Sequence, residues 1–119
     1  MKSSYNFLSG NSNNYYSSDT ARRNEYRKSN LPYSFAYKIK NAFVNKKCPI
    51  CGCFMNYQNN LTRPTIQHNI PISKGGKHEL CNISVICFHC NSSVKNIETG
   101  ELNNEDVVKI WDEICCDKN

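Results

Sequence analysis

The sequence predicts a small α+β protein in which a central region of short strands and loops lies between helices. Two observations carry this prediction. Residues 48–96 are dense in Cys, Gly, Pro and Asn, which favours turns and short strands. The regions on either side carry apolar residues at three- and four-residue spacing, the period of an amphipathic helix. A chain of 119 residues has room for one such domain with tails.

The N-terminal part predicts a polar tail followed by a basic helical extension over residues 18–47. Residues 1–17 offer little apolar surface to offset the entropy of ordering, so they are expected to be disordered. A first helix is expected over residues 21–29, ended by Pro32 because the residue before proline avoids the helical region. A second helix is expected over residues 33–44. Its apolar face comprises Phe35, Ala36, Ile39, Ala42 and Phe43.

The C-terminal part predicts an amphipathic helix that closes a domain spanning residues 48–116. Asn103 or Asn104 precedes Glu105 and Asp106, an arrangement typical of a helix N-terminus. The helix is expected to cover the core with one apolar stripe. That stripe comprises Val107, Ile110, Trp111 and Ile114.

Charge is distributed unevenly along the chain. Residues 1–47 carry nine Lys and Arg against two acidic residues, whereas residues 100–119 carry two against six. A basic front with interleaved tyrosines suits a polyanion such as DNA, because cations that neutralise phosphates release counterions. A solvated basic helix is the alternative interpretation. The candidate DNA-contacting residues in this front are Arg22, Arg23, Arg27 and Lys28.

The compartment follows from what the chain does not contain. No apolar run is long enough to span a membrane, and the first residues lack the apolar stretch of a signal peptide. We therefore expect an intracellular protein, in the cytoplasm or in a host cell, with no membrane partner. Thiols stay reduced there, so paired cysteines are expected to bind metal rather than form disulfides. A secreted peptide stapled by disulfides is the alternative.

Four cysteines form two C-x2-C pairs, Cys48 with Cys51 and Cys87 with Cys90. This spacing lets two thiolates of one turn reach the same ion, and four thiolates suit a structural Zn²⁺. A redox dithiol is the alternative, and Cys53 or Cys81 could replace a ligand. The 35 residues between Cys51 and Cys87 exceed the spacing of an ordinary zinc ribbon. A substantial segment is therefore inserted between the pairs.

The inserted segment carries an ordered set of residues. The set is Gln67-His68-Asn-Ile-Pro71-Ile-Ser73-Lys-Gly75-Gly76, then Asn82, and, after the second Cys pair, Asn91 and Lys95. With the Cys pairs, this order resembles the HNH endonuclease family, in its subgroup with zinc-binding cysteines. The resemblance covers about residues 48–97. It implies a small ββα-metal core and hydrolysis of DNA phosphodiester bonds.

The resemblance also implies roles for individual residues. His68 would be the general base, and Gln67 and Asn91 would bind one catalytic divalent ion, Mg²⁺ or Mn²⁺. Asn82 would tie the loop back so that His68 is held in place. The products would carry a 5′-phosphate and a 3′-hydroxyl. The phosphate-contacting residues would be Lys74, Lys77 and Lys95.

One position departs from the family pattern. Gln67 stands where the family usually has Asp or another strong metal ligand, and a neutral amide binds a hard cation less well than a carboxylate does. The substrate phosphate could complete the site, a softer ion could be used, or activity could have been lost. The alternative function is therefore a weakly active or inactive zinc-stabilised module that binds DNA or a protein. Of the remaining histidines, His78 is expected at the surface or facing DNA, and His89 is expected to point outward.

Overall fold

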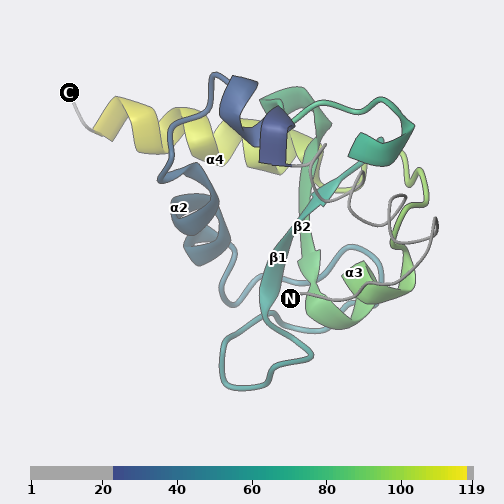
Figure 1. Ribbon diagram of the computed structural model, residues 1–119. Coiled ribbons are helices and arrows are strands. Elements are labelled where there is room, and N and C mark those ends of the chain that lie inside the picture. The colour runs from purple at the N-terminus through teal and green to yellow at the C-terminus, as the bar shows by residue number, and fades with distance from the viewer. Residues whose placement is uncertain (1–22, 118–119) are drawn as a thin grey trace, which may run out of the picture.

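The computed structural model describes residues 23–117 and arranges them as a two-stranded antiparallel sheet with helices packed around it (Figure 1). The elements are α2 (Phe35–Ala42), β1 (Pro64–His68), the 3-10 turns η1 (Ile72–Lys74) and η2 (Leu80–Asn82), β2 (Ile83–Cys87), α3 (Phe88–Ser93) and α4 (Asn104–Asp117). Residues 23–28 form a further helical segment. The predicted α+β class is confirmed.

The hairpin of β1 and β2 continues directly into α3. Pro64 lies opposite Cys87 at one end of the ladder, and His68 lies opposite Ile83 at the other. All five residues of β2 are buried, which suits its β-branched composition. At the end of β2 the Cys87 sulfur accepts a hydrogen bond from the Cys90 backbone N–H at 3.5 Å, and α3 begins there. A β-hairpin followed by a helix is therefore present, as expected.

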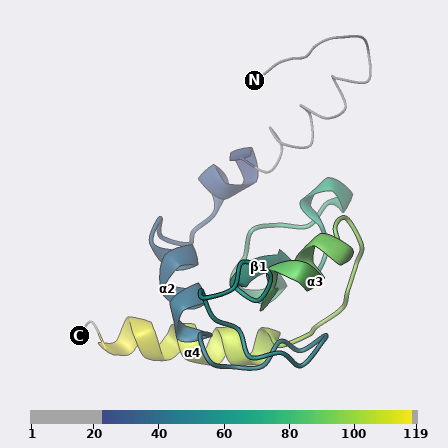
Figure 2. The same cartoon turned by 90° about the horizontal axis from the view of Figure 1, so that it is seen from below.

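The helices α2 and α4 lie against one another (Figures 1 and 2), and α2 packs against β1 whereas α4 packs against β2. The Phe35 ring meets the Trp111 ring edge to face, with 4.9 Å between their centroids. Ile39, Phe43 and Val107 are also fully buried in this core. Both apolar faces predicted from helical spacing therefore pack as expected, and Trp111 belongs to the core.

Two asparagines join the start of α4 to the sheet. Asn103 accepts a hydrogen bond from the Val85 backbone N–H at 2.9 Å and donates to the Val85 carbonyl at 2.8 Å. Asn104 donates to the carbonyls of Leu80 and Ile83, each at 2.8 Å. These side chains satisfy backbone groups of β2 and of the turn before it that face away from β1 and would otherwise lack partners. These hydrogen bonds therefore anchor the helix to the strand.

The helix boundaries differ from the predicted ones by one or two residues. α2 begins two residues after the expected start, because residues 33 and 34 form a turn in which the Phe35 N–H donates to the Pro32 carbonyl at 2.9 Å. The predicted tail over residues 1–17 and the start of the first helix lie outside the described residues. Within residues 23–117, no helix combines the length and apolar character needed to cross a bilayer.

The loop after β1 closes tightly at Gly76. The Gly76 N–H donates to the Pro71 carbonyl at 2.9 Å, and Gly75 adopts a φ of 92°, which favours glycine. A Cβ atom at position 76 would collide with the Ile70 carbonyl, whereas a Cβ at Gly100 would meet open space. The close approach of two backbone segments therefore requires glycine at position 76.

We predict that Gly76→Ala destabilises the fold by more than about 2 kcal/mol, because backbone rather than a flexible side chain must move. Gly100→Ala, which introduces only the strain of a positive φ, is expected to cost about 1 kcal/mol. Urea unfolding followed by circular dichroism measures both changes. Equal losses for the two variants would contradict the packing argument.

Candidate active site

A small hollow of about 160 Å³ lies where β1 ends and α3 and η1 approach it. Its wall includes three residues of the predicted site, Gln67, His68 and Asn91, and one predicted phosphate contact, Lys95. Tyr26, from the N-terminal helical segment, contributes to the same wall. Residues from four parts of the chain therefore meet at one place.

The two amide side chains of the hollow are tied to the protein through their nitrogens. Gln67, which is buried, donates from Nε2 to the His68 carbonyl at 3.1 Å. Asn91 donates from Nδ2 to Thr65 Oγ1 at 2.8 Å and to the Ile66 carbonyl at 3.0 Å. Neither amide oxygen accepts a hydrogen bond from the described residues. Both carbonyl oxygens thus remain available as hard oxygen donors, the type that Mg²⁺ and Mn²⁺ bind.

His68 is paired with a second histidine. Its Nε2 lies 2.9 Å from Nδ1 of His78, a hydrogen-bonding distance. The expectation of a surface or DNA-facing His78 is wrong, because only 6% of the residue is exposed. Burial lowers the pKa of His78 below its ordinary value, although nearby Glu25 opposes the shift, and this favours a neutral imidazole. A single histidine in a Gly-rich loop gave no sequence signal for this pairing.

The N-terminal helical segment covers the histidine pair. The Tyr26 ring stacks on the His78 ring, with 4.0 Å between centroids and 17° between planes. The backbone N–H of His78 donates to the Glu25 carboxylate at 3.3 Å. Phe35 of α2 meets the His78 ring edge to face at 6.1 Å. These contacts come from residues far earlier in the chain, so the pair is enclosed by the extension as well as by its own loop.

Asn82 fixes the loop that carries both histidines. Its Oδ1 accepts a hydrogen bond from the Ile70 N–H at 2.8 Å, and its Nδ2 donates to the carbonyls of Ile70 at 3.0 Å and Lys77 at 2.8 Å. Ile70 follows His68 by two residues, and Lys77 directly precedes His78. One buried amide therefore holds the chain beside each histidine. These bonds tie back the loop that follows His68, and the role of Asn82 in holding His68 for catalysis stays a prediction.

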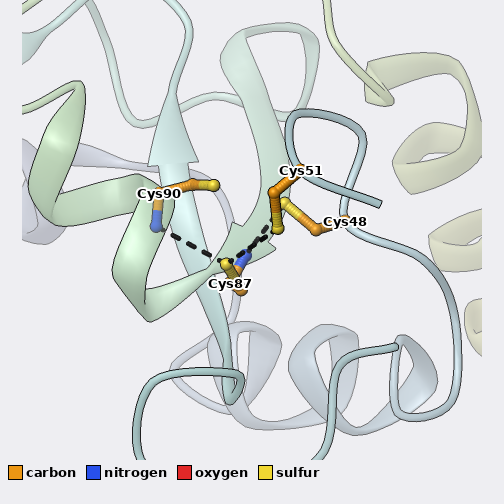
Figure 3. Close-up of side chains that lie close together, drawn as sticks. All are labelled: Cys48, Cys51, Cys87 and Cys90. Atoms are coloured by element: carbon orange, nitrogen blue, oxygen red, sulfur yellow. Dashed lines mark hydrogen bonds between the residues drawn. The ribbon is translucent and has the colours of Figure 1, made fainter. Parts of the chain in front are cut away.

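The cysteines of the two C-x2-C pairs form one cluster (Figure 3). All four sulfur atoms lie within 4.8 Å of one another, and those of Cys51 and Cys87 are 3.7 Å apart. A tetrahedral Zn²⁺ with Zn–S bonds of about 2.3 Å separates its sulfurs by about 3.8 Å. The donor set and spacing therefore fit a structural zinc ion. Cys53 and Cys81, the possible substitutes, are not in this cluster.

The pKa values of these thiols are shifted in opposite directions. The backbone N–H of Cys53 lowers the pKa of Cys51 to about 6, so this thiol ionises readily. Burial raises the pKa of Cys87 and of Cys90, and the neighbouring sulfurs add to the effect at Cys90. Neighbouring thiolates repel one another, which favours the protonated thiols. A bound divalent cation attracts the thiolates and so favours the deprotonated form.

Of the predicted phosphate contacts among the described residues, only Lys95 lines the hollow. Lys74 and Lys77 are exposed on the loop between the strands. Arg23, Arg27 and Lys28 are exposed on the N-terminal helical segment, and Arg22 lies outside the described residues. His89 is exposed, as expected, and Glu79 is exposed as well.

A comparison with protein-family models identifies the segment that contains the hairpin, both Cys pairs and the hollow. Residues 48–96 match the HNH endonuclease family. No curated protein and no solved structure matched the chain. The matched segment begins at the first cysteine of the cluster and ends just after Lys95. The chain therefore contains an HNH endonuclease domain, the domain of a family of phosphodiester hydrolases.

Proposed function

We propose that this protein is a metal-dependent DNA endonuclease whose active site is the hollow formed by Gln67, His68 and Asn91. The observation that carries the proposal is the convergence of a histidine with two unengaged amide oxygens, beside Lys95, inside the HNH segment. Hydrolysis of a phosphodiester needs a base that takes a proton from the attacking water and a cation next to the negative phosphate oxygens. The hollow offers residue types suited to both requirements.

In this proposal His68 is the general base. Water attacks phosphorus in line, its proton passes to the imidazole, the bond to the 3′-oxygen breaks, and the leaving 3′-oxygen takes a proton from solvent water. The products carry a 5′-phosphate and a 3′-hydroxyl. Gln67 and Asn91 would hold Mg²⁺ or Mn²⁺, which supplies positive charge to the phosphate and to the leaving oxygen. Because both amides are neutral, the substrate phosphate is proposed to complete the ion's shell.

His78 is proposed as a positioning residue that sets the tautomer of His68. If His68 donates from Nε2 to Nδ1 of His78, the lone pair of His68 is on Nδ1 and can accept a proton. If His78 instead donates from Nδ1 to Nε2 of His68, the lone pair of His68 is taken by that hydrogen bond. His68 then carries its proton on Nδ1 and cannot act as a base. A neutral His78, favoured by its burial, can accept this hydrogen bond.

The four cysteines are proposed to hold a structural Zn²⁺ that joins the turn at Cys48 to the junction of β2 and α3. The same junction positions Asn91, one residue after Cys90. Lys74, Lys77, Lys95 and the exposed cations of the N-terminal segment are proposed to contact phosphates.

A non-catalytic DNA-binding or protein-binding module is the second candidate. It is favoured by one observation: no carboxylate is among the described residues that line the hollow. Such a module would bind DNA with a salt-dependent affinity and leave it intact.

We predict that the purified protein nicks or cuts supercoiled plasmid in Mg²⁺ or Mn²⁺, and that His68→Ala lowers the rate by about a hundredfold or more. Gel electrophoresis of timed samples measures both rates. His89→Ala, which changes an exposed histidine outside the hollow, should cut like the wild type. Uncut plasmid with every divalent ion, or an active His68→Ala variant, would favour the non-catalytic module.

We predict that His78→Phe lowers kcat by about ten- to a hundredfold with little change in KM, because it removes the acceptor but keeps an aromatic ring under Tyr26. His78→Asn, which can present an oxygen near the position of Nδ1, should recover part of the rate. Thermal unfolding of both variants tests folding. Equal activity of the two variants would contradict a role through the hydrogen bond.

We predict about one Zn²⁺ per chain in the purified protein, measured by mass spectrometry of metals. Removal of zinc by a chelator should unfold the protein, because structural Zn²⁺ contributes about 10 kcal/mol or more in small domains. Cys51→Ser should lower zinc content and thermal stability. Cys115→Ser, which changes an exposed cysteine of α4, should alter neither. A stable, zinc-free wild type would rule out the structural site.

A further inference from the structure

A second and larger hollow of about 950 Å³ lies between the N-terminal helical segment, α2 and the loop before β1. We call it the tyrosine groove, because its wall contains Tyr26, Tyr33, Tyr37 and Tyr57. These four residues come from three separate stretches of the chain. Nothing in the proposed hydrolysis uses Tyr33, Tyr37 or Tyr57.

The four rings are exposed to an extent that core packing does not explain. The exposed fraction is 42% for Tyr26, 53% for Tyr57 and 69% for Tyr37, and Tyr33 is fully exposed. Large apolar side chains that gather in one exposed hollow usually mark a binding surface. Scattered single exposures would need no such explanation.

The charge of the tyrosine groove is positive. Arg23, Arg27 and Lys40 belong to its wall, and no acidic side chain is among the described residues that line it. An aromatic hollow with cationic edges matches the physical requirements of a single nucleic-acid strand, because the bases stack on rings while the phosphates meet cations. A cationic hollow disfavours a basic partner, and its apolar wall gives a paired duplex backbone little to contact.

The tyrosine groove adjoins the candidate active site. Tyr26 belongs to the wall of both hollows. His78 lines the groove and is hydrogen-bonded to His68. A strand lying in the groove would therefore be separated from the hollow that contains His68 by the side chain of Tyr26, which belongs to both walls.

We propose that the tyrosine groove binds unpaired nucleotides of the DNA strand next to the phosphate that is cut, so that the preferred substrate has a single-stranded or frayed segment beside the cleavage position. The statement about the cut strand rests on the proposed nuclease function, whereas binding of unpaired nucleotides does not. Base faces are hidden by stacking within a duplex, so aromatic stacking selects unpaired bases.

The test measures binding without cleavage. Fluorescence anisotropy of a labelled oligothymidylate and of a blunt hairpin duplex with the same number of phosphates is recorded without added Mg²⁺ or Mn²⁺ and without a chelator, so that the cysteine cluster keeps its metal. The single strand is expected to bind more tightly. The double variant Tyr33→Ser and Tyr37→Ser should weaken binding of the single strand by about tenfold or more, with a much smaller effect on the duplex.

Matched variants separate stacking from charge and from folding. Changing the same two tyrosines to Phe should preserve affinity, because stacking needs the ring and not the hydroxyl. Arg27→Ala with Lys40→Ala should reduce the slope of affinity against salt concentration, which the tyrosine variants should leave unchanged. Phe54→Ser, which removes an exposed ring outside the groove, should have no effect.

Three outcomes would overturn the proposal. Equal affinity for duplex and single strand would show that the tyrosine rings do not stack on unpaired bases. Unchanged binding by the double Ser variant would show that the groove is not the site. A dimer of the wild type that the double variant abolishes, detected by sedimentation, would assign the groove to a second copy of the chain. Plasmid that stays intact while the single strand binds as expected would count against the nuclease function and leave the groove assignment standing.

Discussion

The hydrogen bonds of Asn82 are the constraint on which the rest of the candidate site depends. A loop of fourteen residues separates β1 from β2, and a loop of that length has no fixed shape without internal bonds. The buried Asn82 amide forms hydrogen bonds with three backbone groups, which are the N–H and the carbonyl of Ile70 and the carbonyl of Lys77. The two histidines flank these anchor points. Their 2.9 Å separation is therefore a property of the loop, and the loop is shaped by Asn82.

The other end of the hairpin is fixed by different chemistry. Pro64 and Cys87 face one another there, and the sulfur cluster lies at that end, whereas His68 and Ile83 form the end next to the candidate site. Asn91 connects the two regions, because α3 starts at the cluster and its Asn91 side chain returns to Thr65 and Ile66 of β1. A short hairpin with both ends anchored can hold side chains in place although its hydrophobic core is small.

The sequence predicted the elements whose cause is local or periodic. Helical spacing identified the buried faces of α2 and α4, and the C-x2-C spacing identified the four clustered sulfurs. The ordered motif identified Asn82, whose contacts are those of a brace. The pairing of His68 with His78 could not be predicted in this way, because it depends on the path of an irregular loop. The positions of Tyr26 and Glu25 over that pair are long-range contacts of the kind that a motif does not encode.

The contacts of Tyr26 and Glu25 with His78 show that the folded domain extends beyond the segment that matches the family. The family match begins at Cys48, yet the carboxylate bound to the His78 backbone and the ring stacked on its imidazole lie more than twenty residues earlier. Phe35, Ile39 and Phe43 of the same upstream region supply part of the shared core. A fragment cut at the edge of the recognised motif, for transplantation into another protein, would keep every named motif residue. It would nevertheless expose His78 to water on the side where Tyr26 and Phe35 now shield it.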